Sequence, residues 1–336
     1  MASARLLVSV DGGQTATKCL VACVDGTVLA SGRGGPSDHF HGEGGVEKNR
    51  RAIHDAITAA LAAARADSRQ VASVALGLTG APTGGDQDPV VHDIVREILH
   101  PEQIIVVPDY VTNLAGASAG EPGVVLIAGG GAIGYGRTRD GREAIAGGFG
   151  YLLGDEGSAF QIGLQAIAVA CRASDRRDRG TALEPVVRAH FGIGTMREIT
   201  RVVYRSGFSR DHISHLAPKV ADAARAGDGA ARRLFTQAGE ELARTACGVL
   251  RQLAEPGHPV IVYLTGGVFE AGDLVLGPFR AALHGAWPSA EPRTPRFPPA
   301  VGGLILAARA LGRVTDDPWL RTVEASLRDL TAGTTP

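Results

Sequence analysis

The chain contains the same pattern of predicted strands and turns twice. Residues 6–35 (LLVSVDGGQTATKCLVACVDGTVLASGRGG) and residues 123–148 (GVVLIAGGGAIGYGRTRDGREAIAGG) both read as strand, glycine turn, strand, Asp-Gly turn and strand. Asp-Gly between two short apolar runs is typical of a β-hairpin. An internal repeat of this length sets the architecture of the whole chain. The sequence therefore predicts two domains of one sheet design that present their glycine turns to each other across a cleft.

The rest of the chain indicates an α/β fold. After the first three strands come a helix over about 45–66, the strand VASVALGL, the helix VVHDIVREIL, the strand QIIVVPD and a helix after Asp109. Alternation of this kind predicts a sheet with helices packed on it. The second half is rich in helices, expected at about 156–173, 183–191, 196–204, 211–216 and 229–254, before the strand PVIVYLTGG.

The predicted domains follow from this order. We expect an N-terminal domain over residues 1–119 and a C-terminal domain over 120–299. The apolar helix over 300–312 is expected to return to the first domain. The tail over 313–336 is amphipathic at most, and its end, TAGTTP, is expected to be disordered.

Composition excludes several classes of function. The 336 residues suffice for two cores, and a formal net charge of -1 gives no basic surface for nucleic acid. No apolar run is long enough to span a membrane, and the first is too short for a signal peptide, so we expect a cytoplasmic protein. The four cysteines form no C-x-x-C pair, which argues against zinc and against a disulfide framework.

The first glycine turn, DGGQTATK at residues 11–18, suits an anion. Glycines let backbone N–H groups approach a phosphate, and threonines add hydroxyl donors. The spacing is not that of a Walker A loop, and a strand rather than a helix follows, which excludes the dinucleotide-binding fingerprint. From these residues alone, a phosphate site and an ordinary hairpin turn are both open.

The ordered motifs resemble a known superfamily. They are VDGGQTATK, PSDHFHGEGG, VVPDYVTNLAGA, AGGFGYLLGDEGSAFQIG and LTGGVF, and they extend over roughly residues 5–311. Together they resemble the actin-like ATPases, a duplicated ribonuclease H-like fold with a nucleotide and sugar cleft, and within them a BadF/BadG/BcrA/BcrD-type ATPase. The branch that they resemble most is that of the N-acetylglucosamine and glucosamine kinases. The resemblance implies an ATP-dependent kinase that phosphorylates the 6-hydroxyl of an amino sugar.

The resemblance assigns one set of residues to ATP and Mg²⁺. Asp11 would hold the metal, because Mg²⁺ prefers carboxylate and water oxygens. Lys18 either adds charge or is a solvated strand residue. Gly239 lies inside a helix, where either an approach to adenine or tight packing explains it. The other residues expected to bind the nucleotide are Gly12, Gly13, Gln14, Thr15, Gly129, Gly130, Gly131, Ala132, Gly266 and Gly267.

A second set is assigned to the sugar. By resemblance Asp109 is the general base, although an aspartate before YVTNLAGA also suits a helix cap. Asp155 and Glu156 would bind or support sugar hydroxyls, with capping of the following helix as the alternative. The remaining residues expected at the sugar are Asp38, His39, Gly148, Phe149 and Gly150.

Three departures from the resemblance bear on specificity. Asp38 stands where relatives commonly have asparagine, and a carboxylate favours a protonated amine over an N-acetyl group, which predicts glucosamine. Phe149 replaces a tryptophan, which alters an apolar wall of the sugar pocket. The second turn, GGGA, lacks the hydroxyls of a Thr-Gly-Ser type loop, so phosphate contacts would come from backbone N–H groups and activity would be lower.

Other functions compete with this interpretation. The acceptor could be another hexose-like metabolite. A different class is the ATPase activator of 2-hydroxyacyl-CoA dehydratases and benzoyl-CoA reductases, which holds an iron–sulfur cluster, but the cysteines here fall inside predicted strands and helices. A sugar-responsive regulator is a third class, against which the absence of a helix-turn-helix extension argues. The partner expected is a small sugar, and relatives that form homodimers make a homodimer the expected assembly.

Overall fold

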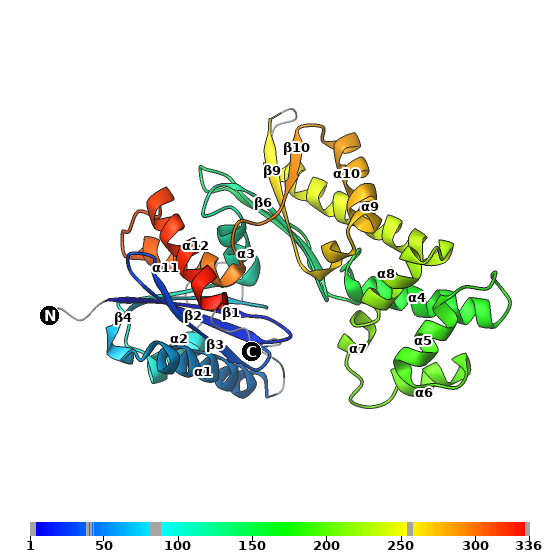
Figure 1. Cartoon of the computed structure of the whole chain (residues 1–336), viewed down its shortest axis with the longest axis horizontal. Helices are drawn as coiled ribbons and strands as arrows, with labels where there is room; N and C mark the ends of the chain where they lie inside the picture. Colours follow the sequence, from blue (N-terminus) through cyan, green and yellow to red (C-terminus); the bar gives the residue numbers. More distant parts are fainter. Residues whose placement is uncertain are drawn as a thin grey trace. The chain divides into compact units, whose positions relative to one another are not determined.

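The computed structural model describes residues 5–37, 40, 42, 44–80, 89–253 and 258–332. The chain divides into two compact units, shown in Figure 1. Unit 1 comprises residues 1–121 and 295–336, and unit 2 comprises residues 122–294. Asp38 and His39, two of the residues predicted at the sugar, lie outside the described residues.

A five-stranded mixed sheet forms the centre of unit 1. Its strand order is β3-β2-β1-β4-β5. β1, β2 and β3 are antiparallel, whereas β4 and β5 continue from β1 in parallel. The strands are β1 (Leu6–Gly12), β2 (Thr17–Cys23), β3 (Val28–Gly34), β4 (Val71–Leu78) and β5 (Gln103–Pro108). Every residue of β4 is buried, as expected of a strand with helices on both faces.

Helices cover both faces of this sheet, as Figure 1 shows. Alternate side chains of β1 enter opposite layers, because successive residues of a strand point to opposite faces. Val8 packs with α1 and α2, and Leu7 packs with α11 and α12. The helices of unit 1 are α1 (Gly45–Ala64), α2 (Pro89–Ile98), α3 (Asp109–Ala117), α11 (Pro299–Ala310) and α12 (Asp317–Ala332).

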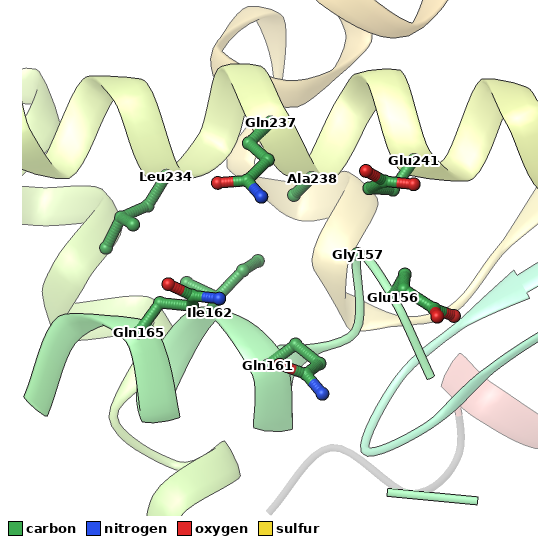
Figure 2. A pocket seen from close by; sticks show the side chains of 9 residues that line it. All are labelled: Glu156, Gly157, Gln161, Ile162, Gln165, Leu234, Gln237, Ala238 and Glu241. Atoms are coloured by element: carbon green, nitrogen blue, oxygen red, sulfur yellow. The ribbon is translucent and has the colours of Figure 1, made fainter. Parts of the chain in front are cut away.

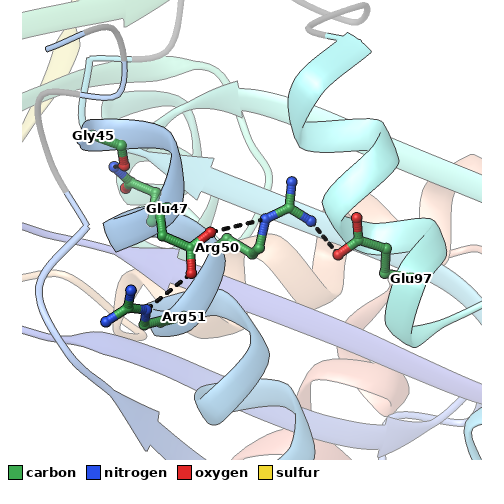
Figure 3. A network of polar contacts seen from close by, with 6 residues as sticks. Gly45, Glu47, Arg50, Arg51 and Glu97 are labelled. Carbon is green, nitrogen blue, oxygen red and sulfur yellow. Dashed lines mark hydrogen bonds and ion pairs between the residues drawn. The ribbon is translucent and has the colours of Figure 1, made fainter. Parts of the chain in front are cut away.

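Polar contacts on the outside of unit 1 join α1 to α2 (Figure 3). Arg50 of α1 pairs with Glu97 of α2, and Glu47 contacts both Arg50 and Arg51. These side chains are largely exposed. Exposed ion pairs contribute between zero and about 1 kcal/mol each, so the apolar layer beneath them carries most of the stability.

Unit 2 repeats the sheet of unit 1. Its strand order is β10-β9-β6-β7-β8, with β6, β7 and β8 antiparallel and β9 and β10 parallel to β6. The strands are β6 (Gly123–Ala128), β7 (Ala132–Arg137), β8 (Glu143–Gly147), β9 (Val260–Thr265) and β10 (Ala290–Arg293). β6 thus takes the place of β1 in an otherwise identical topology. This confirms the predicted duplication.

The helices of unit 2 enclose one large core. The long helix α9 packs on the antiparallel strands of the sheet and along α10. The bounds of the helices are α4 (Ala159–Ser174), α5 (Leu183–Phe191), α6 (Ile199–Val203), α7 (Asp211–Ser214), α8 (Ala217–Arg225), α9 (Gly229–Leu253) and α10 (Asp273–Ala286). Among the helices that the structure describes, we find none with the length and apolarity that crossing a bilayer requires.

One helix begins later than the sequence predicts, and the tail has a place in the core that the sequence did not predict. The helix expected from about residue 156 begins at Ala159, because the Ser158 side chain caps it by accepting a hydrogen bond from the Gln161 amide. The tail forms α12, whose Trp319 and Val323 are buried in unit 1. The sequence prediction left open where the tail packs, and the structure places the buried side of α12 against unit 1.

Candidate functional site

Three polar residues lie at, or directly after, the ends of the parallel strands of unit 1, at one edge of its sheet. Asp11 lies near the end of β1, Thr79 follows β4, and Asp109 follows β5. The carboxyl ends of parallel strands are where α/β sheets bind ligands. Sequence reasoning found the two aspartates but missed Thr79. Thr79 could have been identified from the sequence as a polar residue directly after a mostly apolar strand.

Asp109 is held by the residues around it. Its Oδ2 accepts a hydrogen bond from Thr79 Oγ1 at 2.7 Å. The helix cap of α3 is Pro108, without a side-chain hydrogen bond, so Asp109 stands in the first turn of the helix. Burial raises the pKa of the Asp109 carboxyl, and hydrogen bonds from Thr79 and from the Tyr110 amide act in the opposite direction. A half-buried carboxyl of this kind is suited to proton transfer.

Asp11 shares this edge with Asp109. Burial raises the pKa of Asp11 to about 6, Lys18 lowers it, and the nearby Asp109 raises it again. Lys18 lies directly opposite Asp11 in the β1–β2 ladder. Two carboxyls that interact in this way would be stabilised in their charged forms by a cation. Within the described ranges no three His, Cys, Asp or Glu side chains gather as a metal site, so a metal at Asp11 would need water or phosphate oxygens as well.

The first glycine turn presents backbone donors. The Gly13 amide donates to the Ala16 carbonyl at 3.2 Å and thereby closes the turn. In the part of the chain that the structure describes, the amides of Gln14, Thr15 and Ala16 have no acceptor. Consecutive free amides of this kind form an anion-binding concavity, so the turn fits a phosphate group.

Packing explains why the first turn contains glycine. A Cβ on Gly12 would lie 2.6 Å from Leu78 Cδ2 and 3.0 Å from Ser37 Oγ. The Ser37 amide donates to the Gly13 carbonyl at 2.9 Å, and its buried hydroxyl bonds to Asn49 at the start of α1. Sequence reasoning missed Ser37 and Asn49, which connect the turn to α1.

The second glycine turn contacts Asp155. The Ala132 amide donates to Asp155 Oδ1 at 3.1 Å, and the Gly129 amide donates to the Gly131 carbonyl at 2.9 Å. For the described residues, this leaves the amides of Gly130 and Gly131 without an acceptor. Of the four residues predicted to offer amides to phosphate, two therefore have free amides here, and Ala132 is engaged by a carboxylate.

Asp155 is not the cap of the following helix, because Ser158 takes that role. It is 4% exposed and has a φ of 62°, a conformation that few residues other than glycine adopt. Burial raises the pKa of its carboxyl, the Ala132 amide and Arg210 lower it, and Glu156 raises it. A buried carboxylate on strained backbone is typical of a functional position.

The segment before Asp155 exposes apolar side chains. Phe149, Leu152 and Leu153 are 75%, 80% and 80% exposed. Gly148 and Gly150, at φ values of 73° and 81°, allow the chain to turn on either side of Phe149. Sequence reasoning included Gly148, Phe149 and Gly150 but missed the two leucines.

Glu156 lies at the edge of a slot between α4 and α9 (Figure 2). The slot has a volume of about 100 Å³. Glycine at position 157 allows the backbone to pack closely against α9, because a Cβ there would lie 2.6 Å from Leu242 Cγ. The other residues around the slot are Gln161, Ile162, Gln165, Leu234, Gln237, Ala238 and Glu241. The i, i+4 spacing of the polar residues on each helix could have indicated this shared face from the sequence.

The glycines predicted at adenosine serve the fold as well. Gly266 has a φ of 104°, and a Cβ there would lie 2.3 Å from the Ala128 carbonyl oxygen, whereas Gly267 has open space around it. Gly239 is buried, and a Cβ there would lie 2.6 Å from the Val275 carbonyl oxygen of α10. Tight packing of α9 on α10 therefore accounts for Gly239 without a contact to adenine.

Two copies of one mixed sheet, each with a glycine turn after its first strand, define the fold of the actin-like ATPases and sugar kinases. The chain belongs to the BadF/BadG/BcrA/BcrD ATPase family, whose model matches residues 8–307. Both findings confirm the resemblance seen in the sequence.

Named relatives match over most of their lengths. The N-acetylmuramic acid/N-acetylglucosamine kinase of Clostridium acetobutylicum is 28% identical over 303 residues, 90% of this chain and 98% of the relative. The glucosamine kinase GspK of Vibrio cholerae is 27% identical over 238 residues, 70% of this chain and 77% of the relative. A solved structure of a candidate N-acetylglucosamine kinase from Chromobacterium violaceum has a TM-score of 0.74 and 30% identity, covering 91% of this chain and 99% of that one.

Proposed function

We propose that the protein is an ATP-dependent amino-sugar kinase that transfers the γ-phosphate of ATP to the 6-hydroxyl of glucosamine or N-acetylglucosamine. The observation that carries this proposal is Asp109, a half-buried carboxylate oriented by Thr79 at the ligand-binding edge of a parallel sheet. The relatives named as amino-sugar kinases support the choice of acceptor.

Asp109 acts as the general base. Phosphoryl transfer needs positioning and charge stabilisation more than covalent help from the protein, so one base near the acceptor hydroxyl suffices. The carboxylate accepts the proton that the 6-hydroxyl loses as its oxygen bonds to phosphorus. The ADP oxygen leaves with the electron pair of the broken bond.

The glycine turns bind the phosphates. The free amides of Gln14 and Thr15 in unit 1, and those of Gly130 and Gly131 in unit 2, donate to phosphate oxygens. Asp11 holds Mg²⁺, which supplies charge neutralisation when it is bound. Lys18, opposite Asp11, adds positive charge on the same side. Gly266 and Gly267 lie against the adenosine.

A second set of residues binds the acceptor. Asp155 uses its second carboxylate oxygen for a sugar hydroxyl, since Oδ1 accepts from Ala132. Phe149 offers an apolar face to the ring, and Glu156 supports this site. Asp38, a carboxylate where relatives commonly have asparagine, favours glucosamine over the N-acetylated sugar.

The cysteines do not favour the alternative of an ATPase activator with an iron–sulfur cluster. Cys19 and Cys247 are buried, and burial raises the pKa of both thiols. Cys23 and Cys171 are partly buried in a strand and a helix. Thiolates that ligate iron need lowered pKa values and access to the cluster.

The decisive experiment measures ADP release with ATP and Mg²⁺ in the presence of glucosamine, N-acetylglucosamine, glucose or no sugar. We expect sugar-dependent turnover that falls by about 100-fold or more in Asp109→Asn, since general-base catalysis contributes 10²–10⁴-fold. Asp93→Asn, which changes an exposed carboxylate of α2, is the matched control. ATP hydrolysis that is equally fast without sugar, or an active Asp109→Asn, would contradict the proposal.

A further inference from the structure

Thr79 has three polar contacts within hydrogen-bond distance at the point where β4 ends. Its backbone amide donates to the Gly12 carbonyl at 3.0 Å. Its hydroxyl oxygen lies 2.7 Å from Asp109 Oδ2 and 3.1 Å from the same Gly12 carbonyl oxygen. One side chain therefore connects the carboxylate of Asp109 with the start of the first glycine turn.

The hydroxyl carries one proton and faces two acceptors. It can donate to only one of them at a time. A hydroxyl donates more strongly to a carboxylate than to a carbonyl, and the shorter distance is the one to Asp109. The Gly12 carbonyl already accepts from the Thr79 amide, so it does not depend on the hydroxyl.

We propose that Thr79 is a positioning residue of the phosphoryl transfer, which holds the Asp109 carboxylate in one rotation and at a fixed place relative to the first glycine turn. This inference rests on the proposed function. With Oδ2 engaged by Thr79, the carboxylate is not free to rotate its charge away from the acceptor hydroxyl. A misplacement of about 1 Å can lower a rate by 10²-fold, so a group that fixes this rotation affects turnover.

The hydrogen bonds around Thr79 indicate that its hydroxyl does more than stabilise the fold. The backbone amide of Thr79 already joins β4 to β1 at this point. Other buried hydroxyls of the same sheet, those of Ser73 on β4 and Thr17 on β2, have no hydrogen-bond partner among the described residues. The sheet thus tolerates a hydroxyl without a partner, whereas the one at position 79 is aimed at the base.

The test compares three variants. Thr79→Val keeps the branched shape but removes the hydroxyl, Thr79→Ser keeps the hydroxyl, and Ser73→Ala removes a hydroxyl without a partner from the same strand. We expect Thr79→Val to lower kcat about 10- to 100-fold with the KM for ATP changed less than about 3-fold. Thr79→Ser is expected to recover most of kcat, and Ser73→Ala to match the wild type.

The pH profile separates positioning from mere support of the fold. The Thr79 hydrogen bond lowers the pKa of Asp109, so its loss is expected to move the acidic limb of the kcat/KM profile to higher pH. A structural role alone would lower the melting temperature and leave that limb in place. A Thr79→Val enzyme with kcat within 2-fold of the wild type and an unchanged limb would overturn the inference.

A second measurement does not depend on kinase activity. The titration of the Asp109 carboxyl can be followed by ¹³C NMR of aspartate-labelled protein, with Asp109→Asn to assign the signal. We expect a higher midpoint in Thr79→Val than in the wild type and in Ser73→Ala. Equal midpoints would overturn the inference, and a wild type without sugar-dependent turnover but with shifted midpoints would instead contradict only the proposed function.

Discussion

The amide of Ala132 donates to the carboxylate of Asp155, with 3.1 Å between N and Oδ1. This bond connects the second glycine turn to a residue assigned to the sugar, just as the hydroxyl of Thr79 connects the first turn to Asp109. Each unit therefore joins a glycine turn, which we propose binds phosphate, to a carboxylate that we propose for the acceptor site. In the proposed kinase, a ligand that shifts one member of such a pair would also shift the other, so the two pairs would couple the binding of the two substrates.

Gly131 tests the contact between the second turn and Asp155. A Cβ on Gly131 would lie 2.9 Å from Asp155 Oδ2 and 3.0 Å from Oδ1. We expect Gly131→Ala to displace the carboxylate from the Ala132 amide and to lower the free energy of unfolding by about 1–3 kcal/mol in urea. Gly129→Ala is the matched control, because nothing lies within 4 Å of its Cβ position. Equal stabilities of the two variants would contradict the Asp155–Ala132 contact.

Asp11 is expected to lower stability at neutral pH when no metal is present. Its carboxyl binds a proton more tightly in the folded protein, where burial raises the pKa to about 6, than in the unfolded chain, where the pKa is 3.8. A carboxyl of this kind lowers stability as the pH rises from about 4 to 6, by up to about 3 kcal/mol above that range. Asp11→Asn should therefore melt at a higher temperature than the wild type at pH 7.5 in EDTA.

The pH dependence makes this prediction specific. The difference between Asp11→Asn and the wild type should shrink toward zero as the pH falls below about 3, because the carboxyl is then protonated in both the folded and the unfolded state. Asp93→Asn controls for the loss of one negative charge at an exposed position. A wild type that melts at the same temperature as Asp11→Asn at pH 7.5 would show that ionisation of Asp11 carries no penalty.

Much of the fold could be predicted from local patterns. The two glycine turns and the Asp-Gly hairpins of the duplicated strands could be predicted because each is encoded by a short stretch of residues. The conformation of such a stretch depends on few neighbouring residues. The bounds predicted for α5, residues 183–191, match the structure, because its apolar spacing is regular. Asp109 could be placed at the sheet edge because it directly follows an apolar strand.

Long-range packing explains what the sequence did not reveal. β10 contains Pro292 in a proline-rich segment, and a proline is tolerated there because β10 is an edge strand. The role of Thr79 depends on two residues that are 67 and 30 positions away in the chain. Such a contact is set by strand order and leaves no local signature.

Trp319 tests how firmly α12 belongs to unit 1. Its side chain is 6% exposed, and its Nε1 donates to the Val24 carbonyl at 3.2 Å. We expect Trp319→Ala to lower the free energy of unfolding by about 3–5 kcal/mol, the usual effect of removing a buried aromatic side chain. Val314→Ala, at a position that is 75% exposed, is expected to change it by less than about 0.5 kcal/mol. Similar urea curves for both variants would mean that α12 does not contribute to the core.

Two glycines in neighbouring helices should respond to alanine with opposite signs. At Gly239 of α9 a Cβ would lie 2.6 Å from the Val275 carbonyl oxygen and 2.9 Å from the Phe279 amide, so α10 would have to move. At Gly285 of α10, which is exposed, none of the described residues beyond its chain neighbours lies within 4 Å of the Cβ position. Overpacking costs about 1–3 kcal/mol, whereas alanine is more favourable than glycine by up to about 1 kcal/mol in an open part of a helix.

We therefore expect Gly239→Ala to lower the melting temperature and Gly285→Ala to raise it. Differential scanning calorimetry measures both melting temperatures. Gly285→Ala shows the gain in helix propensity that Gly239→Ala would share if its surroundings were open. A Gly239→Ala protein that is stabilised to the same degree would mean that α9 and α10 leave room for a side chain here. In that case a contact with the nucleotide, the alternative that the sequence left open, would be the better reason for glycine at this position, and weaker ATP binding by Gly239→Ala would show it.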